Sequence, residues 1–259
     1  MKKFRLGLLR FLNALPLTFK LRNHPEVEEF WGLPVELTDL LRAGKLDGAL
    51  TSAYVYAKKY KSLISDLCIA SQGRVQTVML YSNSPIDEIR VIEEDPVSIT
   101  SNAIVRMIFA ERKQRISFKQ STLSPYRSSK PGAGETFELK EKTGRILIGD
   151  ANFNPPFKAD FVYDVAALVW EHFRLPCVFA LWQGQKAVDG RLKELIEWAF
   201  EEVQKDWSAL YEFAGKNWSV PRSAMEDYFQ NVLHYRLTDK DKEFLEFFSK
   251  RIHDMQLPW

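Results

Sequence analysis

The 259-residue sequence has few of the residues that usually reveal a function by their numbers. It contains only two cysteines, Cys68 and Cys177, and their spacing is not that of a C-x-x-C motif. A disulfide framework, a zinc site and thiol redox chemistry are therefore not indicated. Both cysteines lie in apolar stretches, so we expect them to be small core residues in a reducing compartment. No run of about 18 apolar residues occurs, which argues against a transmembrane helix.

The sequence also has no large excess of positive or negative charge. The 36 basic residues nearly balance the 34 acidic residues, and a net charge of +2 gives no electrostatic reason to expect nucleic acid or a membrane surface as a partner. The four histidines are scattered without metal-ligand spacing, and neither H-E-x-x-H nor G-x-S-x-G is present. The GAGETF stretch lacks the third glycine of a dinucleotide fingerprint. Neither a metal site nor a dinucleotide-binding loop is therefore indicated.

The first twenty residues, MKKFRLGLLRFLNALPLTFK, have the basic start and apolar middle of a secretory signal. Arg5 and Arg10 interrupt the apolar stretch, Asn13 and Pro16 break what remains, and no A-x-A-like cleavage site follows. We therefore expect no secretory signal here, and a cytoplasmic protein.

The order of apolar patterns predicts an α/β protein. Alternating or buried strands are expected at residues 4–8, 46–52, 67–71, 75–82, 145–150 and 176–182. Helices are expected between them, except that residues 72–74 alone join the third strand to the fourth. From Val188 onward the pattern is helical and amphipathic, with Thr238 as a cap. The stretch 121–143 is dense in Ser, Pro, Gly and Lys and is expected to be a surface excursion.

Asn13 follows the first predicted strand, within the apolar stretch RFLNALPL. Two interpretations are open. Asn13 caps the next helix, with Pro16 in its first turn, or it contacts a ligand, because open α/β sheets bind ligands at the carboxyl ends of their strands.

Small polar residues recur at the ends of the other strands: Ser52, Ser71, Thr77, Ser98, Thr100 and Ser101. Hydroxyl and amide groups at a helix start favour an anion, because unpaired N–H groups and the helix dipole both attract negative charge. The simpler alternative is that Ser101 only caps its helix. Gly73 is a candidate for a positive φ or for close approach of the backbone to a ligand. Asp150, at the end of RILIGD, is either an acid or base or a structural cap, and Asp164 is predicted to cap a helix.

Several stretches, in the same order along the chain, resemble the chorismate dehydratase family of the futalosine route to menaquinone. RFLNALPL resembles the family's FLN-x-x-PL motif, and AGKLDGALTSAYVY resembles its G-x-LD segment. SQGRVQTVMLYS is similar to its G-x-V-x-S strand, SITS to its S-R-T-S turn, LIGDA to its LIGDAA and LPCVFALW to its LPFVFAVW.

The resemblance implies the fold of type II periplasmic binding proteins, with two α/β lobes, a ligand in the cleft and a helical C-terminal tail. On this basis residues 1–86 and 184–259 would form lobe one and residues 87–183 lobe two. The implied reaction removes water from chorismate to give 3-[(1-carboxyvinyl)oxy]benzoate, without metal or cofactor.

The resemblance also implies roles for individual residues. Asn13 would be the main catalytic residue, and Thr77 would take the place of the family's active-site serine. Ser98, Thr100 and Ser101 would bind a substrate carboxylate, and Ser52, Gly73 and Asp150 are further substrate-binding candidates.

The chain departs from the family pattern at Thr77 and at Ile99, where arginine is usual. Two alternatives therefore stay open: a sister naphthoate synthase on the same fold, and a non-catalytic binder of a small carboxylate.

Overall fold

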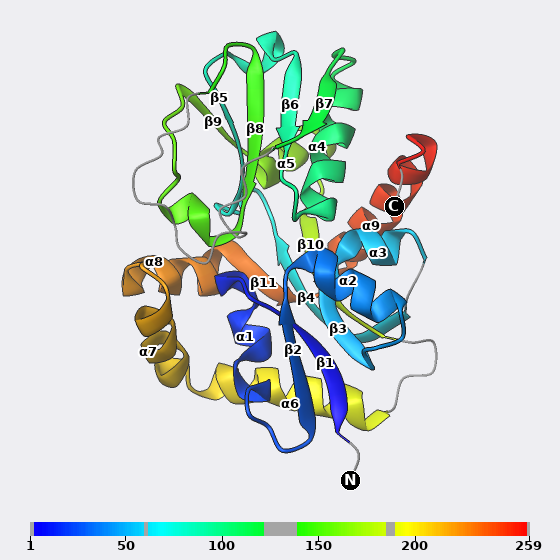
Figure 1. Cartoon of the computed structure of the whole chain (residues 1–259), viewed down its shortest axis with the longest axis vertical. Coiled ribbons are helices and arrows are strands. Elements are labelled where there is room, and N and C mark those ends of the chain that lie inside the picture. The colour runs from blue at the N-terminus through cyan, green and yellow to red at the C-terminus, as the bar shows by residue number, and fades with distance from the viewer. Residues whose placement is uncertain (1–2, 60–61, 122–138, 185–189, 258–259) are drawn as a thin grey trace. The chain divides into compact units, whose positions relative to one another are not determined.

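In this computed structural model the chain is described over residues 3–59, 62–121, 139–184 and 190–257. It divides into two compact units, and the backbone passes between them twice (Figure 1). Unit 1 comprises residues 1–71 and 177–259, and unit 2 comprises residues 72–176. The predicted surface excursion at 121–143 falls mostly on residues 122–138, outside the described part of the chain.

Unit 1 is built on a six-stranded sheet in the order β11-β4-β10-β3-β1-β2. Its strands are β1 (Phe4–Leu9), β2 (Val27–Gly32), β3 (Gly48–Ser52), β4 (Ser62–Ser71), β10 (Cys177–Gly184) and β11 (Leu233–Arg236). β1 is parallel to β2 and β3, whereas β10 is antiparallel to both β3 and β4. The carboxyl ends of β1, β3 and β4 therefore lie along one edge of the sheet.

Helices cover this sheet. They are α1 (Leu15–Thr18), α2 (Pro34–Arg42), α3 (Ala53–Ala57), α6 (Gly190–Lys205), α7 (Ser208–Asn217), α8 (Arg222–Asp227) and α9 (Asp239–Asp254), with 3-10 turns η1 (Leu12–Ala14) and η2 (Phe19–Leu21) and a π-helical turn η5 (Tyr228–Val232). α9 begins as predicted, because Thr238 and Asp241 form a reciprocal capping box. The predicted all-helical tail is wrong at β11, which pairs antiparallel with β4.

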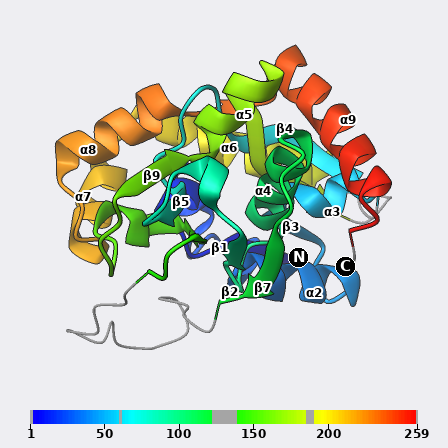
Figure 2. The same cartoon turned by 90° about the horizontal axis from the view of Figure 1, so that it is seen from above.

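Unit 2 holds a five-stranded sheet in the order β7-β6-β8-β5-β9. Its strands are β5 (Val78–Ser82), β6 (Val91–Glu94), β7 (Ser117–Gln120), β8 (Thr143–Ile148) and β9 (Phe161–Asp164). Its helices are α4 (Ile99–Glu111) and α5 (Val165–Phe173), which pack against each other (Figure 2), and the 3-10 turns η3 (Ile86–Glu88) and η4 (Gly149–Phe153).

The boundaries of the two units differ from the predicted lobes. Residues 72–86 belong to unit 2, because β5 pairs with β8 and β9 of the five-stranded sheet. Residues 177–183 belong to unit 1, because β10 lies between β3 and β4 of the six-stranded sheet. The chain therefore passes between the units at 71/72 and 176/177, in both cases nearer the N-terminus than predicted. The difference arises because strand pairing is non-local.

The core of each unit is apolar. Cys68 and Cys177 are free thiols and fully buried, as expected from their neighbours. Trp182, Tyr54 and Phe248 are among the largest fully buried side chains. None of the described helices is both long enough and apolar enough to cross a membrane.

Candidate functional site

The edge of the unit 1 sheet where β1, β3 and β4 end carries three of the polar residues singled out above. Asn13 lies just after β1, Ser52 ends β3 and Ser71 ends β4. The carboxyl ends of parallel strands are where α/β sheets bind their ligands. The fold thus brings Asn13, Ser52 and Ser71 to one edge.

Asn13 does not cap a helix. It lies inside η1, whose N-cap is Phe11, and the following α1 has Ala14 as its N-cap without a side-chain hydrogen bond. Pro16 is in the first turn of α1 as predicted. The Oδ1 atom of Asn13 is buried and has no hydrogen-bond partner. The capping interpretation is therefore wrong, because neither helix start uses the Asn13 side chain. An unsatisfied buried amide oxygen costs roughly 1–3 kcal/mol.

Ser52 has a structural task. Its Oγ accepts a hydrogen bond from the Tyr54 amide at 3.3 Å, which caps α3. Its backbone carbonyl accepts a 2.9 Å bond from Nε2 of the buried Gln183 on β10. Ser52 is thus part of the scaffold that holds this edge.

In unit 2 the corresponding edge of the sheet gathers the remaining candidates. β6, β7 and β8 are parallel, and β5 and β9 are arranged so that β5 begins and β9 ends at the carboxyl ends of those strands. Thr77, the segment 95–101 and Asp150 therefore lie along one edge. The topology joins residues that are up to 73 positions apart in sequence, as between Thr77 and Asp150.

A single carboxylate holds the loop that carries Thr77. Oδ2 of Asp164 accepts hydrogen bonds from the amides of Val75 and Gln76, both at 2.8 Å. Its Oδ1 accepts bonds from Ala166 at 2.9 Å and Ala167 at 3.2 Å, which caps α5 as predicted. Asp164 therefore fixes the loop before β5 and the start of α5 at once.

The Thr77 turn itself is tight. The Thr77 amide bonds to the Val75 carbonyl at 2.8 Å, and Gln76 between them has φ +62°. A left-handed conformation in a non-glycine residue costs of order 1 kcal/mol and persists only where neighbours enforce it. The Thr77 carbonyl in turn accepts a 2.7 Å bond from Gly149, so the β5 and β8 ends are tied together.

Gly73 adopts φ +82°, so the prediction of a positive φ is confirmed. Apart from Gly73 and its two chain neighbours, no atom of the described residues lies within 4 Å of where a Cβ would stand. The conformation, rather than crowding, is what this position requires of its residue.

The start of α4 differs from the prediction in its cap. Ser98, not Ser101, is the N-cap, and its Oγ accepts the Ser101 amide at 3.2 Å. Thr100 and Ser101 lie in the first turn and are buried, with 4% and 3% of their surface exposed. The first turn itself carries no acidic side chain, and the nearby Asp95 carboxylate bonds the Val97 amide before the helix begins.

Asp95, which follows β6, is a buried acid that sequence reasoning missed. Its Oδ1 accepts the Val97 amide at 3.0 Å, and its Oδ2 accepts the Ile148 amide at 3.3 Å. Burial raises the pKa of Asp95 to about 6, against these two bonds that lower it. Glu93 and Glu94 are also buried, but they pair with Arg145 and Arg106, whereas the Asp95 carboxylate accepts backbone amides.

Asp150 lies in the first turn of η4 and is partly exposed. Nearby, Nδ2 of Asn152 donates to the carbonyls of Thr77 at 3.1 Å and Gly149 at 3.0 Å. Whether Asp150 contacts a substrate stays a prediction, and so do the roles of the other candidates.

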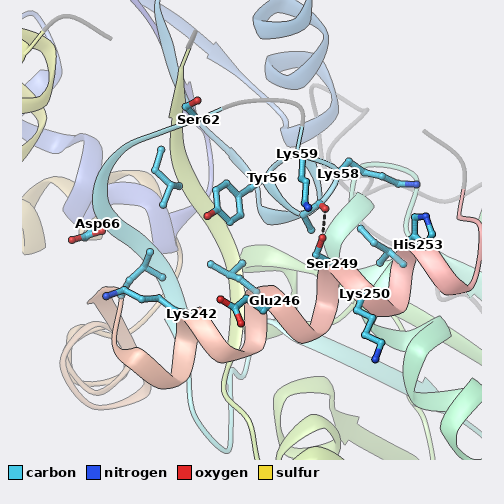
Figure 3. Close-up of a pocket in the computed structure, with 15 residues that line it drawn as sticks. Tyr56, Lys58, Lys59, Ser62, Asp66, Lys242, Glu246, Ser249, Lys250 and His253 are labelled. Atoms are coloured by element: carbon cyan, nitrogen blue, oxygen red, sulfur yellow. Dashed lines mark hydrogen bonds between the residues drawn. The ribbon is translucent and has the colours of Figure 1, made fainter. Parts of the chain in front are cut away.

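The large cavity of unit 1 does not contain these residues. It measures about 1120 Å³, lies among α3, β4 and α9 and is lined by charged side chains such as Lys58, Lys242 and Glu246 (Figure 3). Ser249 Oγ ties α9 to the Ala57 carbonyl at its wall. Over residues 3–59, 62–121, 139–184 and 190–257, no three His, Cys, Asp or Glu side chains gather as a metal site would require.

Comparison with known proteins gives a consistent result. A chorismate dehydratase from Thermus thermophilus is 26% identical over 277 aligned positions, which cover 97% of this chain and 96% of that protein. The solved structure of protein AF1704 from Archaeoglobus fulgidus has a TM-score of 0.73 at 12% identity and covers 99% of this chain and 98% of its own.

An alkanesulfonate-binding protein from Xanthomonas axonopodis has a TM-score of 0.62 at 11% identity, covering 100% of this chain and 95% of its own. These likenesses confirm the α/β fold of the periplasmic binding proteins. The family model described as menaquinone biosynthesis matches residues 4–254, and the chain therefore belongs to the menaquinone biosynthesis family.

Proposed function

We propose that this protein is a chorismate dehydratase, a hydro-lyase that converts chorismate to 3-[(1-carboxyvinyl)oxy]benzoate and water. The observation that carries the proposal is the Thermus thermophilus chorismate dehydratase, whose similarity extends over 97% of the chain. The proposed setting is the cytoplasm, with chorismate as a small-molecule substrate and neither nucleic acid nor a membrane as a partner.

The chemistry suits a site of neutral groups. Loss of the ring proton next to the enolpyruvyl ether and of the neighbouring hydroxyl makes the ring aromatic, so the substrate supplies the driving force. The enzyme has to hold two carboxylates, fix the geometry and assist departure of hydroxide. The loss of a proton and a hydroxide from the substrate needs neither a metal nor an organic cofactor.

The start of α4 supports binding of a carboxylate. Buried Thr100 and Ser101 lie in a first turn without acidic side chains, and amides and hydroxyls there attract an anion without a counter-charge. We assign one substrate carboxylate to Ser98, Thr100 and Ser101, with Ser52, Gly73 and Asp150 as further substrate-binding candidates.

Asn13 and Thr77 orient the reacting ring in this proposal. The unpartnered Oδ1 of Asn13 supports its role, because a ligand hydroxyl would satisfy it. The substrate's own side-chain carboxylate accepts the proton. Asp95 is not assigned as the base, because both of its oxygens already accept backbone amides.

The test is incubation of purified, metal-free protein with chorismate, followed by mass and by the ultraviolet change on aromatisation. Loss of one water with formation of the enolpyruvyl benzoate is expected. Binding without conversion would favour a carboxylate binder, and conversion only of a later pathway intermediate would favour the sister naphthoate synthase.

A further inference from the structure

Asn152 lies in η4, the turn that follows β8, and its side chain bonds to four other residues or backbone groups. Its Nδ2 atom lies 3.1 Å from the carbonyl oxygen of Thr77 and 3.0 Å from the carbonyl oxygens of both Leu147 and Gly149. Its Oδ1 atom accepts the hydroxyl of Tyr81 at 3.0 Å. One carboxamide therefore joins the residue before β5, the end of β8 and η4.

The Tyr81 hydroxyl determines which way this carboxamide points. Tyr81 is buried, and its ring packs edge-on against Phe157 with 5.0 Å between the ring centroids. Burial raises the pKa of Tyr81 to about 12, so its hydroxyl stays protonated at neutral pH and donates to Oδ1. The amide nitrogen therefore faces the three carbonyls, and its two protons are both used within the protein. Asn152 thus holds backbone and has no proton to offer a ligand.

The Thr77 turn is held at both of its ends. Asp164 accepts the amides of the two residues before Thr77, as described above. The Thr77 carbonyl accepts the Gly149 amide at 2.7 Å as well as Nδ2 of Asn152. Asp150 lies between Gly149 and Asn152 in the sequence, so the same bonds fix where Asp150 stands relative to Thr77.

We propose that Asn152 is a positioning residue for the reaction, whose carboxamide holds the Thr77 turn against the turn that carries Asp150 before the substrate binds. This inference rests on the proposed function, which places Thr77 at the reacting ring. Without these bonds the substrate has to order the two turns as it binds, so its apparent affinity falls. Asn152 stands where the family motif LIGDAA has its last alanine, so the bonds belong to this chain and not to the motif.

Two asparagine variants test the proposal. The matched control is Asn83, which follows β5 at its other end, where its Nδ2 donates to the Leu139 carbonyl at 2.9 Å and its Oδ1 accepts the Asp160 amide at 3.3 Å. Asn152→Ala and Asn83→Ala each remove carboxamide bonds to the backbone of unit 2, so both should lower the melting temperature.

The kinetics distinguish the two variants at a temperature where both are folded. In Asn152→Ala the KM for chorismate should rise at least about fivefold, while kcat changes by less than about threefold. In Asn83→Ala both constants should keep their wild-type values, because its bonds lie at the far end of the strand from Thr77.

Tyr81→Phe is a second and milder test. It removes the hydroxyl that orients the carboxamide and leaves the three carbonyls in place. The KM for chorismate should rise in the same direction by a smaller factor, about threefold, with kcat unchanged.

The outcomes separate this inference from the proposed function. If wild-type protein converts chorismate and folded Asn152→Ala keeps the wild-type KM, Asn152 is only structural, and the dehydratase proposal stands. An equal rise of KM in Asn83→Ala would also overturn the inference, because the effect would then reflect general loosening of unit 2. If Asn152→Ala does not fold, a wild-type KM in Tyr81→Phe overturns it. If wild-type protein neither binds nor converts chorismate, both proposals fall together.

Discussion

The carboxylate of Asp95 accepts a hydrogen bond from the Ile148 amide at 3.3 Å and so joins the loop before α4 to the end of β8. The same loop is braced by Asn102, whose Nδ2 donates to the Asp95 carbonyl at 2.8 Å and whose Oδ1 accepts the Asp95 amide at 3.1 Å. The start of α4, where a substrate carboxylate is proposed to bind, is therefore held by a buried acid.

Asp95 makes stability depend on pH. Its pKa is raised from the ordinary 3.8 to about 6 in the folded protein, so the native state holds this proton more tightly than the unfolded chain does. Its contribution is therefore greatest below about pH 4 and is lost as pH rises through about 6, by up to roughly 3 kcal/mol. We expect Asp95→Asn to remove this loss, as measured by urea denaturation from pH 4 to pH 7.

The other carboxyl groups titrate in both proteins, so their effect cancels in the difference in unfolding free energy between wild type and Asp95→Asn. That difference should therefore change from pH 4 to pH 7 through Asp95 alone. Asp39→Asn, at an exposed position on α2, is the matched control and should show a constant difference. A constant difference for Asp95→Asn as well would contradict the raised pKa.

Asn13→Ala separates catalysis from folding. The Oδ1 atom has no partner to lose, so the free energy of unfolding should change by less than about 1 kcal/mol. Turnover of chorismate should fall at least about 100-fold, as on loss of a positioned polar group at a reacting centre. Asn231→Ala, at an exposed position of the same unit, should keep wild-type turnover, and wild-type turnover in Asn13→Ala would refute the assignment.

Asp164→Ala should loosen the Thr77 loop. The substitution removes an acceptor of four backbone amides, so we expect the unfolding free energy to fall by about 2 kcal/mol and the KM for chorismate to rise. Thr238→Ala removes the cap of α9 in unit 1 and should destabilise without changing KM. Equal kinetic effects of the two variants would mean that Asp164 acts through stability alone.

Glu93→Gln should break a buried ion pair with Arg145. The Glu93 and Arg145 side chains are only 10% and 12% exposed, and Lys119 is a second partner of Glu93 at 3.1 Å. Burial opposes the charge, but the bonds from Arg145 and Lys119 prevail and hold the pKa of Glu93 below its ordinary value. Removing one partner leaves a buried charge and should cost about 3 kcal/mol by calorimetry.

The neighbouring Glu94→Gln is the control for this prediction. Its partner Arg106 is 32% exposed, so the guanidinium can be hydrated after the substitution. The loss of unfolding free energy should therefore be clearly smaller than for Glu93→Gln. Equal costs for the two variants would show that the burial of Arg145 is not what matters.

Local patterns in the sequence were sufficient for much of the fold. The apolar runs located the cores of β1, β3, β8 and β10, and side-chain chemistry located the caps Asp164 and Thr238. β11 was missed, because a four-residue strand within a helical region is stabilised by pairing with β4 and not by its own periodicity. The predicted boundaries of the two units differ from the observed ones for the same reason, because β5 and β10 are placed by strand partners that are distant in sequence.

The sequence by itself therefore determined the α/β class, the family motifs and the polar residue types at the strand ends, because those depend on neighbours along the chain. Only the tertiary structure decided which of these polar groups are already satisfied. Ser52 and Ser98 bind nearby amides, whereas Asn13 and Ser71 keep buried atoms without partners, and Asp95 is shut away from water. Burial and hydrogen-bond pairing arise from strands and helices that meet across long stretches of chain, so no local pattern could have distinguished them.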